Sequence, residues 1–113
     1  MQDTPPSSPI HVYFALLPGS LVLDWAGPAE ALRIANQALV GRGQPERFVQ
    51  HFVSPTPHSV TSVGAMLTGL EPLPATLPTP AWVVLGGLAG RHLDAAGAEA
   101  RALLHWLRGL RPV

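Results

Sequence analysis

Residues 10–20 read IHVYFALLPGS, and this stretch decides the fold. Its first eight residues are apolar and rich in β-branched and aromatic side chains, which is typical of a strand buried on both faces inside a parallel sheet. The turn-forming residues Pro18, Gly19 and Ser20 end the strand, and we expect Ser20 to cap a following helix. The sequence therefore predicts a strand that turns directly into a helix.

A helix is predicted from about residue 21 to residue 40, because apolar side chains recur there at spacings of three and four. The apolar residues at 32, 35, 38 and 39 share one face, and Arg33 and Asn36 fall on another. The pair Gly27 and Pro28 leaves two alternatives. Either the helix begins at Pro28, or an earlier helix is kinked there.

The remaining segments continue the alternation of strands and helices. The alternating residues 47–54 predict a second strand, and the Ser/Thr/Val-rich residues 59–67, with Gly64 in the middle, predict a short hairpin or an edge pair. A proline-rich connector at 72–80 leads to a buried strand at 82–85, which Gly86 and Gly87 end. A last helix is expected over about 93–109. This order predicts an α/β fold, in which a parallel sheet carries helices on both faces.

Length and composition limit the classes of function. The 113 residues allow one domain, in which 1–9 form a flexible lead and 10–113 the folded part. The formal net charge is zero, so this chain is a poor candidate for binding DNA itself. No apolar run is long enough for a membrane helix, and the first residues do not form a secretory signal, so we expect a cytoplasmic protein without membrane contact. Without cysteine, the chain has no disulfide, thiolate metal site or cysteine nucleophile.

Asp24 is the first candidate functional residue, because it is the only charged residue between His11 and Glu30. Apolar surroundings disfavour the charged form of a carboxyl group, and such a group can hold a proton for a reacting neighbour. The alternative is structural: Asp24 caps the helix or lies in its first turn, where acidic residues are favoured. The pattern alone favours the structural alternative.

Gly86 and Gly87 are the second candidates, because they follow a buried strand and precede a helix. Glycines let the backbone approach a ligand closely, and the ends of parallel strands are where α/β proteins form sites. A plain tight turn is the alternative, and the run does not match a dinucleotide or phosphate loop, so no cofactor is predicted. The five histidines do not cluster in the sequence, and none has metal-ligand spacing, so no metal site is predicted either.

Several of these segments together resemble a known family. Residues 17–20 (LPGS), 23–30 (LDWAGPAE) and 35–36 (AN) resemble the opening of ThiJ/PfpI domains, which belong to the class I glutamine amidotransferase-like superfamily. The later segments 70–73 (LEPL), 82–87 (WVVLGG) and 104–108 (LHWLR) fit the same domains. The similarity is greatest to the bacterial branch that is fused to AraC-type helix-turn-helix domains, the GlxA-like transcriptional regulators.

The resemblance implies a fold and roles for the candidate residues. It implies a three-layer, flavodoxin-like domain that is incomplete at its C-terminus, because the strand, the nucleophile elbow and the DNA-binding domain expected after Pro112 are absent. In enzymes of the superfamily, the acid that matches Asp24 hydrogen-bonds an elbow cysteine. The backbone at Gly86 and Gly87 would line the oxyanion pocket. Leu85 stands where the family usually has proline.

Three functions follow as expectations. The leading one is the ligand-sensing and dimerising part of an AraC-type regulator, which binds a small-molecule effector at Asp24, Gly86 and Gly87 and is not itself an enzyme. The full-length parent would be a homodimer and would reach DNA only through its C-terminal domain. The alternatives are the N-terminal part of an isonitrile hydratase-like or other ThiJ/PfpI hydrolase, and an inactive truncated product. With unpaired strand edges, we expect the chain alone to be marginally stable and to associate.

Overall fold

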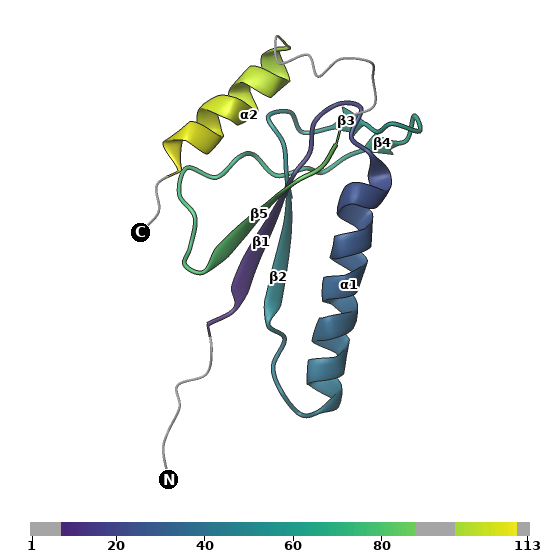
Figure 1. Cartoon of the computed structure of the whole chain (residues 1–113), viewed down its shortest axis with the longest axis vertical. Helices are drawn as coiled ribbons and strands as arrows, with labels where there is room; N and C mark the ends of the chain where they lie inside the picture. Colours follow the sequence, from purple (N-terminus) through teal and green to yellow (C-terminus); the bar gives the residue numbers. More distant parts are fainter. Residues whose placement is uncertain (1–7, 88–96, 111–113) are drawn as a thin grey trace.

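A computed structural model describes residues 8–87 and 97–110 of the chain. Its strands are β1 (Ile10–Ala15), β2 (Phe48–Val53), β3 (Ser59–Val60), β4 (Met66–Leu67) and β5 (Ala81–Leu85). Its helices are α1 (Val22–Gly41) and α2 (Ala98–Gly109). The three longer strands form a parallel sheet in the order β2-β1-β5, and β3 pairs with β4 as an antiparallel hairpin (Figure 1). The predicted α/β class, the three parallel strands and the hairpin are therefore confirmed.

The central strand β1 is buried on both faces, as its composition predicts. The side chains of Val12 and Phe14 lie on the face that α1 covers, where Phe14 stacks on Phe52 with ring centroids 5.2 Å apart. Tyr13 and Ala15 lie on the other face and pack against α2. Because alternate residues of a strand point to opposite faces, one apolar run supplies both halves of the core.

Helix α1 starts at Val22 and runs through Pro28, so the chain adopts the earlier of the two predicted starts. The expectation that Ser20 caps this helix is wrong: Leu21 holds the N-cap position, and no side chain bonds to the free N–H groups there. The physical reason is a competing contact. The carbonyl of Ser20 accepts a hydrogen bond from the N–H of Ser62 at 2.9 Å, which holds Ser20 outside the helix.

Asn36 is the one buried side chain of α1, although the helical pattern placed it with Arg33 on a polar face. Its Nδ2 donates to the carbonyl of Phe48 at 2.8 Å, and its Oδ1 accepts from the N–H groups of Arg47 and Phe48, both at 2.9 Å. These backbone groups belong to the start of strand β2. A buried amide is therefore favourable here, because it satisfies backbone groups that a purely apolar helix face would leave unpaired.

Helix α2 accounts for the later part of the helix predicted over 93–109; the earlier part lies outside the described residues. Leu103 is its buried residue and packs against Tyr13, Ala15 and Val53. The indole Nε1 of Trp106 donates to the carbonyl of Pro74 at 2.6 Å, which fastens α2 to the proline-rich connector. The predicted lead at 1–9 and everything expected after Pro112 fall largely or wholly outside the described residues. Within the described ranges, no helix has the length and apolar character needed to cross a membrane.

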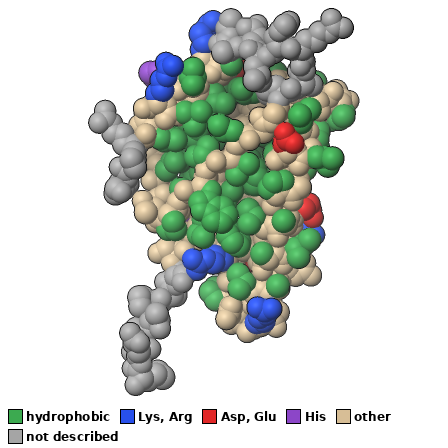
Figure 2. Space-filling view, in the orientation of Figure 1, with side chains coloured by type: hydrophobic (Ala, Val, Ile, Leu, Met, Phe, Trp, Pro, Cys, Tyr) green, Lys and Arg blue, Asp and Glu red, His purple; other side chains and the backbone are tan. Residues whose placement is uncertain are grey.

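Strand β5 forms one edge of the described sheet, and apolar side chains on it remain uncovered. Trp82 is 46% exposed and Leu85 is 52% exposed. Hydrophobic side chains dominate the face of the molecule that carries β5 (Figure 2). An exposed, apolar edge strand is a template for pairing with another chain.

We expect the chain to self-associate through this edge. Sedimentation velocity should show an average mass that rises with protein concentration, and Trp82→Lys should shift the distribution toward monomer, because a charge on an edge strand opposes pairing. Val63→Lys is the matched control, since Val63 is more exposed but lies in the β3–β4 turn. A concentration-independent monomer for the unmodified chain would contradict the expectation.

Candidate functional site

The candidate residues Asp24, Gly86 and Gly87 meet at the edge of the sheet where strands β1 and β5 end. Asp24 lies in the first turn of α1, as the structural alternative predicts. Gly86 and Gly87 directly follow β5. Parallel strands place their carboxyl ends at one edge, and the turns that follow them gather there.

Two hydrogen bonds join these segments, which are 63 residues apart in the chain. The N–H of Gly87 donates to Oδ2 of Asp24 at 2.7 Å, and the N–H of Leu21 donates to the carbonyl of Gly87 at 3.0 Å. A bond from a backbone N–H to a carboxylate is charge-assisted and stronger than a neutral one. The start of α1 is therefore tied to the end of β5 through both the N–H and the carbonyl of Gly87.

The absence of side chains at 86 and 87 is what allows this approach. A Cβ at Gly87 would lie 2.9 Å from Oδ2 of Asp24 and 3.0 Å from Cδ1 of Leu21. A Cβ at Gly86 would lie 3.2 Å from Cβ of Asp24. The two glycines thus allow the backbone to pack closely against the Asp24 carboxylate. A turn without that contact would not need glycine at both positions.

Two details differ from the sequence-based expectation for these residues. The Asp24 side chain is exposed, and its neighbour Leu23 is 82% exposed, so the carboxyl group does not lie in the expected apolar surroundings. The first turn of α1 exposes the side chains of Leu23 and Asp24 to solvent, which the apolar residues around Asp24 in the sequence do not indicate. In addition, the Gly87 N–H already donates to Asp24, so it is not open to an anion while that bond persists.

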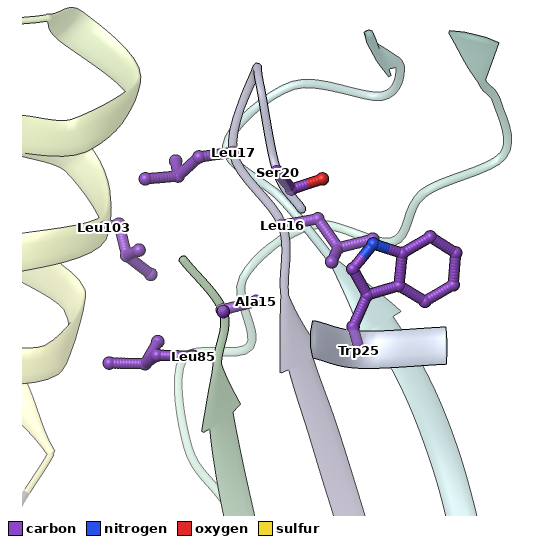
Figure 3. A pocket seen from close by; sticks show the side chains of 8 residues that line it. Ala15, Leu16, Leu17, Ser20, Trp25, Leu85 and Leu103 are labelled. Carbon is purple, nitrogen blue, oxygen red and sulfur yellow. The ribbon is translucent and has the colours of Figure 1, made fainter. Parts of the chain in front are cut away.

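A cavity of about 140 Å³ lies next to the Asp24–Gly87 contact, at the ends of β1 and β5. It touches four parts of the fold: the end of β1 and the turn after it, the first turn of α1, the end of β5, and α2. The residues that line it are Ala15, Leu16, Leu17, Ser20, Trp25, Leu85, Gly86 and Leu103 (Figure 3). Its walls are therefore largely apolar, and Gly86 connects it to the Asp24–Gly87 contact.

Two polar atoms at this cavity are buried without a partner among the described residues: Oγ of Ser20 and Nε1 of Trp25. Ser20 is only 4% exposed, so solvent does not satisfy its hydroxyl group. Native proteins leave few such groups unpaired, and each asks for an explanation such as a water molecule or a ligand. Sequence reasoning missed both residues as site candidates, because a serine after a strand indicates a cap and a tryptophan in a helix indicates core packing.

A second polar cluster brings together two histidines that are far apart in the sequence. Nδ1 of His11 and Nε2 of His51 share a hydrogen bond of 2.9 Å, and Nδ1 of His51 lies 3.7 Å from Oε1 of Glu71. Residues 11 and 51 are close because β1 and β2 pair in parallel with Tyr13 opposite His51. No group of three or more metal-binding side chains is found in the part of the chain that the structure describes.

Tyr13 stacks on His51 with ring centroids 4.5 Å apart, and its environment changes its pKa. Burial raises the pKa of Tyr13 above its ordinary value of 10.0, and the nearby carboxylate of Glu71 raises this pKa further. A group with a raised folded-state pKa contributes stability that is present below the unfolded pKa and is lost as the pH rises through the folded one.

We therefore expect the free energy of unfolding to fall as the pH rises above about 10, and to fall less steeply in Tyr13→Phe. Tyr13 is the only tyrosine of the chain, so the absorbance of tyrosinate reports its ionisation directly. The check is a urea titration of both proteins at neutral and alkaline pH. Equal alkaline losses in the two proteins would show that Tyr13 is not the cause.

Comparison of the chain with protein-family models, with curated proteins and with solved structures finds no match in any of the three. The likeness to ThiJ/PfpI domains therefore rests on the motifs in residues 17–36, 70–73, 82–87 and 104–108 alone.

Proposed function

We propose that this chain is the small-molecule-binding part of a ThiJ/PfpI-like effector domain, of the kind that is fused to AraC-type transcriptional regulators. The observation that carries the proposal is the cavity at the ends of β1 and β5, beside the contact between Asp24 and Gly87. The proposal includes the three-layer, flavodoxin-like architecture of those domains, with this sheet as its centre.

The position of the cavity supports a binding role. In α/β proteins, ligands bind outside the carboxyl ends of parallel strands, and small-molecule sites are mostly apolar with a few polar groups that orient the ligand. The cavity fits this position and the apolar part of this description, because it lies at the ends of β1 and β5 and leucine side chains dominate its lining. The contact between Asp24 and Gly87 holds the two segments that form its rim.

The chemistry of the site supports binding over covalent catalysis. A serine or cysteine nucleophile needs an adjacent base or a lowered pKa. The Ser20 hydroxyl has no hydrogen-bond partner among the described residues, and the Asp24 carboxylate is occupied by the Gly87 N–H. No described base lies within hydrogen-bond distance of the Ser20 hydroxyl, and the Asp24 carboxylate instead joins α1 to the end of β5.

The cavity also offers a way to transmit binding. Trp25 belongs to α1, Leu85 to β5 and Leu103 to α2, so a ligand in contact with all three fits only one relative placement of these elements. A ligand shifts an equilibrium by its differential affinity for the two states. In a regulator, the favoured placement would be passed to a homodimer interface and to a separate DNA-binding domain.

A hydrolase is the second candidate, and the carboxylate of Asp24 beside Gly86 and Gly87 is the observation that favours it. In that case Asp24 would release the Gly87 N–H and orient a nucleophile that this chain does not contain. The N–H would then become available to a developing oxyanion.

The nucleotide sequence beyond the codon for Val113, translated in all three frames, separates these functions. The proposal predicts an open frame with a Cys-x-Gly elbow followed by a basic helix-turn-helix domain. The same elbow followed by an early stop would favour the hydrolase. Stop codons in every frame would contradict both functions and favour an inactive product.

A further inference from the structure

Two histidines on the face of the sheet that carries Tyr13 form a contact whose chemistry depends on pH. We propose that the hydrogen bond between His11 and His51 is an acid-sensitive contact between strands β1 and β2. It holds while the pair carries at most one added proton, and it breaks when both imidazole rings are protonated. Neither histidine lines the cavity, so this proposal does not depend on the proposed function.

The two imidazole rings meet edge to edge through one nitrogen each. Nδ1 of His11 and Nε2 of His51 are 2.9 Å apart, the ring centroids are 5.2 Å apart, and the ring planes differ by 17°. The centroid separation exceeds the nitrogen separation by roughly the radii of the two rings, so both nitrogens lie close to the line that joins the ring centres. In this arrangement one nitrogen presents an N–H and the other presents a lone pair.

The carboxylate of Glu71 determines which of the two rings donates. Its Oε1 lies 3.7 Å from Nδ1 of His51, the nitrogen that His11 does not contact. A carboxylate favours a proton on the imidazole nitrogen that faces it, so Nδ1 of His51 carries the proton and Nε2 is left as the acceptor. His11 therefore donates through its own Nδ1, and both neutral rings hold their proton on Nδ1.

Protonation of both rings is incompatible with this contact. An imidazolium ring has an N–H on each nitrogen, so two such rings would place two N–H groups against each other across the 2.9 Å contact. One added proton is compatible, because it can enter at Nε2 of His11 and leaves the donor and the acceptor between the rings unchanged. The folded pair thus accommodates one added proton, and a second proton requires the rings to separate.

The titratable groups around the pair set its surroundings. Tyr13 of β1 stacks on His51, and because burial raises the pKa of Tyr13, its phenol stays neutral throughout the acidic range. The Glu71 carboxylate stabilises one added charge, but it does not supply the lone pair that a second protonation removes. From β5, the register partner of His11 is Ala81, which carries no charge. Arg47 directly precedes β2, and helix α2, which packs on the same face through Leu103, carries Glu99, Arg101, His105 and Arg108.

This restriction on the second proton links folding to pH. Histidines of an unfolded chain titrate near pH 6.5, so at about pH 5 both rings bind a proton once the contact has opened. Where the unfolded chain binds one proton more than the folded chain, the unfolding equilibrium constant rises by up to about tenfold for each unit that the pH falls. We therefore expect acid to weaken the attachment of β2 to β1 below about pH 6.

A double-mutant cycle measures the contact directly. The full chain, His11→Ala, His51→Ala and the double variant are unfolded with urea at about pH 7.5 and about pH 5, where ordinary carboxyl groups remain mostly charged. We expect the two histidines to favour the folded state jointly by about three- to tenfold at the higher pH, as one net hydrogen bond allows. At the lower pH this coupling should vanish or reverse. An equal favourable coupling at both pH values would overturn the proposal.

A milder variant keeps the test decisive if the alanine variants fail to fold. In His11→Gln, the side-chain amide can accept from a protonated His51 or donate to a neutral one, so the contact survives in both states. This variant should lose most of the destabilisation by acid. His58→Gln is the matched control, because it removes an exposed histidine from the loop before β3 and should keep that destabilisation. Equal destabilisation by acid in the original chain and in His11→Gln would contradict the acid-sensitive contact.

Nitrogen NMR of the imidazole rings adds a readout that a purely structural contact would not predict. At neutral pH, His11 and His51 should both hold their proton on Nδ1, and a neutral His51 with its proton on Nε2 would overturn the role of Glu71. In the folded chain at about pH 5, the pair should hold only one added proton. Two fully protonated rings in the folded chain, with strand β2 still paired to β1, would overturn the proposal.

Discussion

Replacing Asn36 with alanine is expected to lower the free energy of unfolding by about 2–4 kcal/mol. The substitution removes three hydrogen bonds and leaves the N–H groups of Arg47 and Phe48 and the carbonyl of Phe48 without their partner. Removing one partner of a buried polar group costs more than the bond itself contributes, because the other group stays desolvated. The free energy of unfolding of small domains is about 5–15 kcal/mol, so the loss of this single side chain removes a large fraction of it.

Urea unfolding followed by circular dichroism measures this loss. Gln37→Ala is the matched control, because it removes an amide of similar size from the next residue of the same helix, where the side chain is exposed and accepts only one long bond from Arg33. We expect Gln37→Ala to change the unfolding midpoint little. If the two variants lose the same stability, the contact between Asn36 and the start of β2 does not hold α1 against the sheet.

Gly87→Ala is expected to destabilise the chain by about 1–3 kcal/mol and to weaken the binding of a small probe ring such as pyridine at the cavity. The added methyl group would overlap Oδ2 of Asp24 and Cδ1 of Leu21, so the first turn of α1 must move away from the end of β5. Trp25 belongs to that same helix end and lines the cavity, so the movement displaces part of the cavity wall.

Two further variants separate this contact from a general effect of alanine. Gly41→Ala places a methyl group in open space in the last turn of α1 and is expected to stabilise the chain by up to about 1 kcal/mol, since glycine is unfavourable in a helix. In the background of Asp24→Ala, the closest atom is gone, so Gly87→Ala should cost clearly less than in the original chain. An undiminished cost there would show that Asp24 is not what Gly87 accommodates.

The architecture was predictable where local pattern and tertiary structure agree. The run at 10–17 predicts a doubly buried strand because its residues are apolar on both alternating faces, and β1 is that strand. The Gly64 turn and the glycine pair after β5 likewise act through local geometry. The α/β class follows from the order of such segments and needs no knowledge of which side chains touch.

The site was predictable only in part, because its contacts depend on strand order and register. The sequence indicates Asp24 and Gly87 as candidates one by one, from residue type and position. The hydrogen bond between them depends on the placement of α1 beside β5, which the sequence pattern does not give. The pair His11 and His51 depends on the parallel register of β1 and β2 in the same way. The burial of Asn36 and Ser20 was not predicted, because an amide in a helix is usually exposed and a serine in a turn usually caps a helix. Here other segments of the fold cover both side chains.

The most direct test of the account is the indole N–H spectrum of the ¹⁵N-labelled chain with and without pyridine, a probe ring of about the size of the cavity. The chain has three tryptophans, so three indole signals are expected, and each is assigned by its Trp→Phe variant. Trp25 should shift because its side chain lines the cavity, whereas Trp106 donates to the carbonyl of Pro74, Trp82 lies on the exposed edge of β5, and neither of these two lines the cavity. A shift of the Trp25 signal alone would support a ligand site at the ends of β1 and β5. A larger shift at Trp82 or Trp106, or none at Trp25, would contradict it.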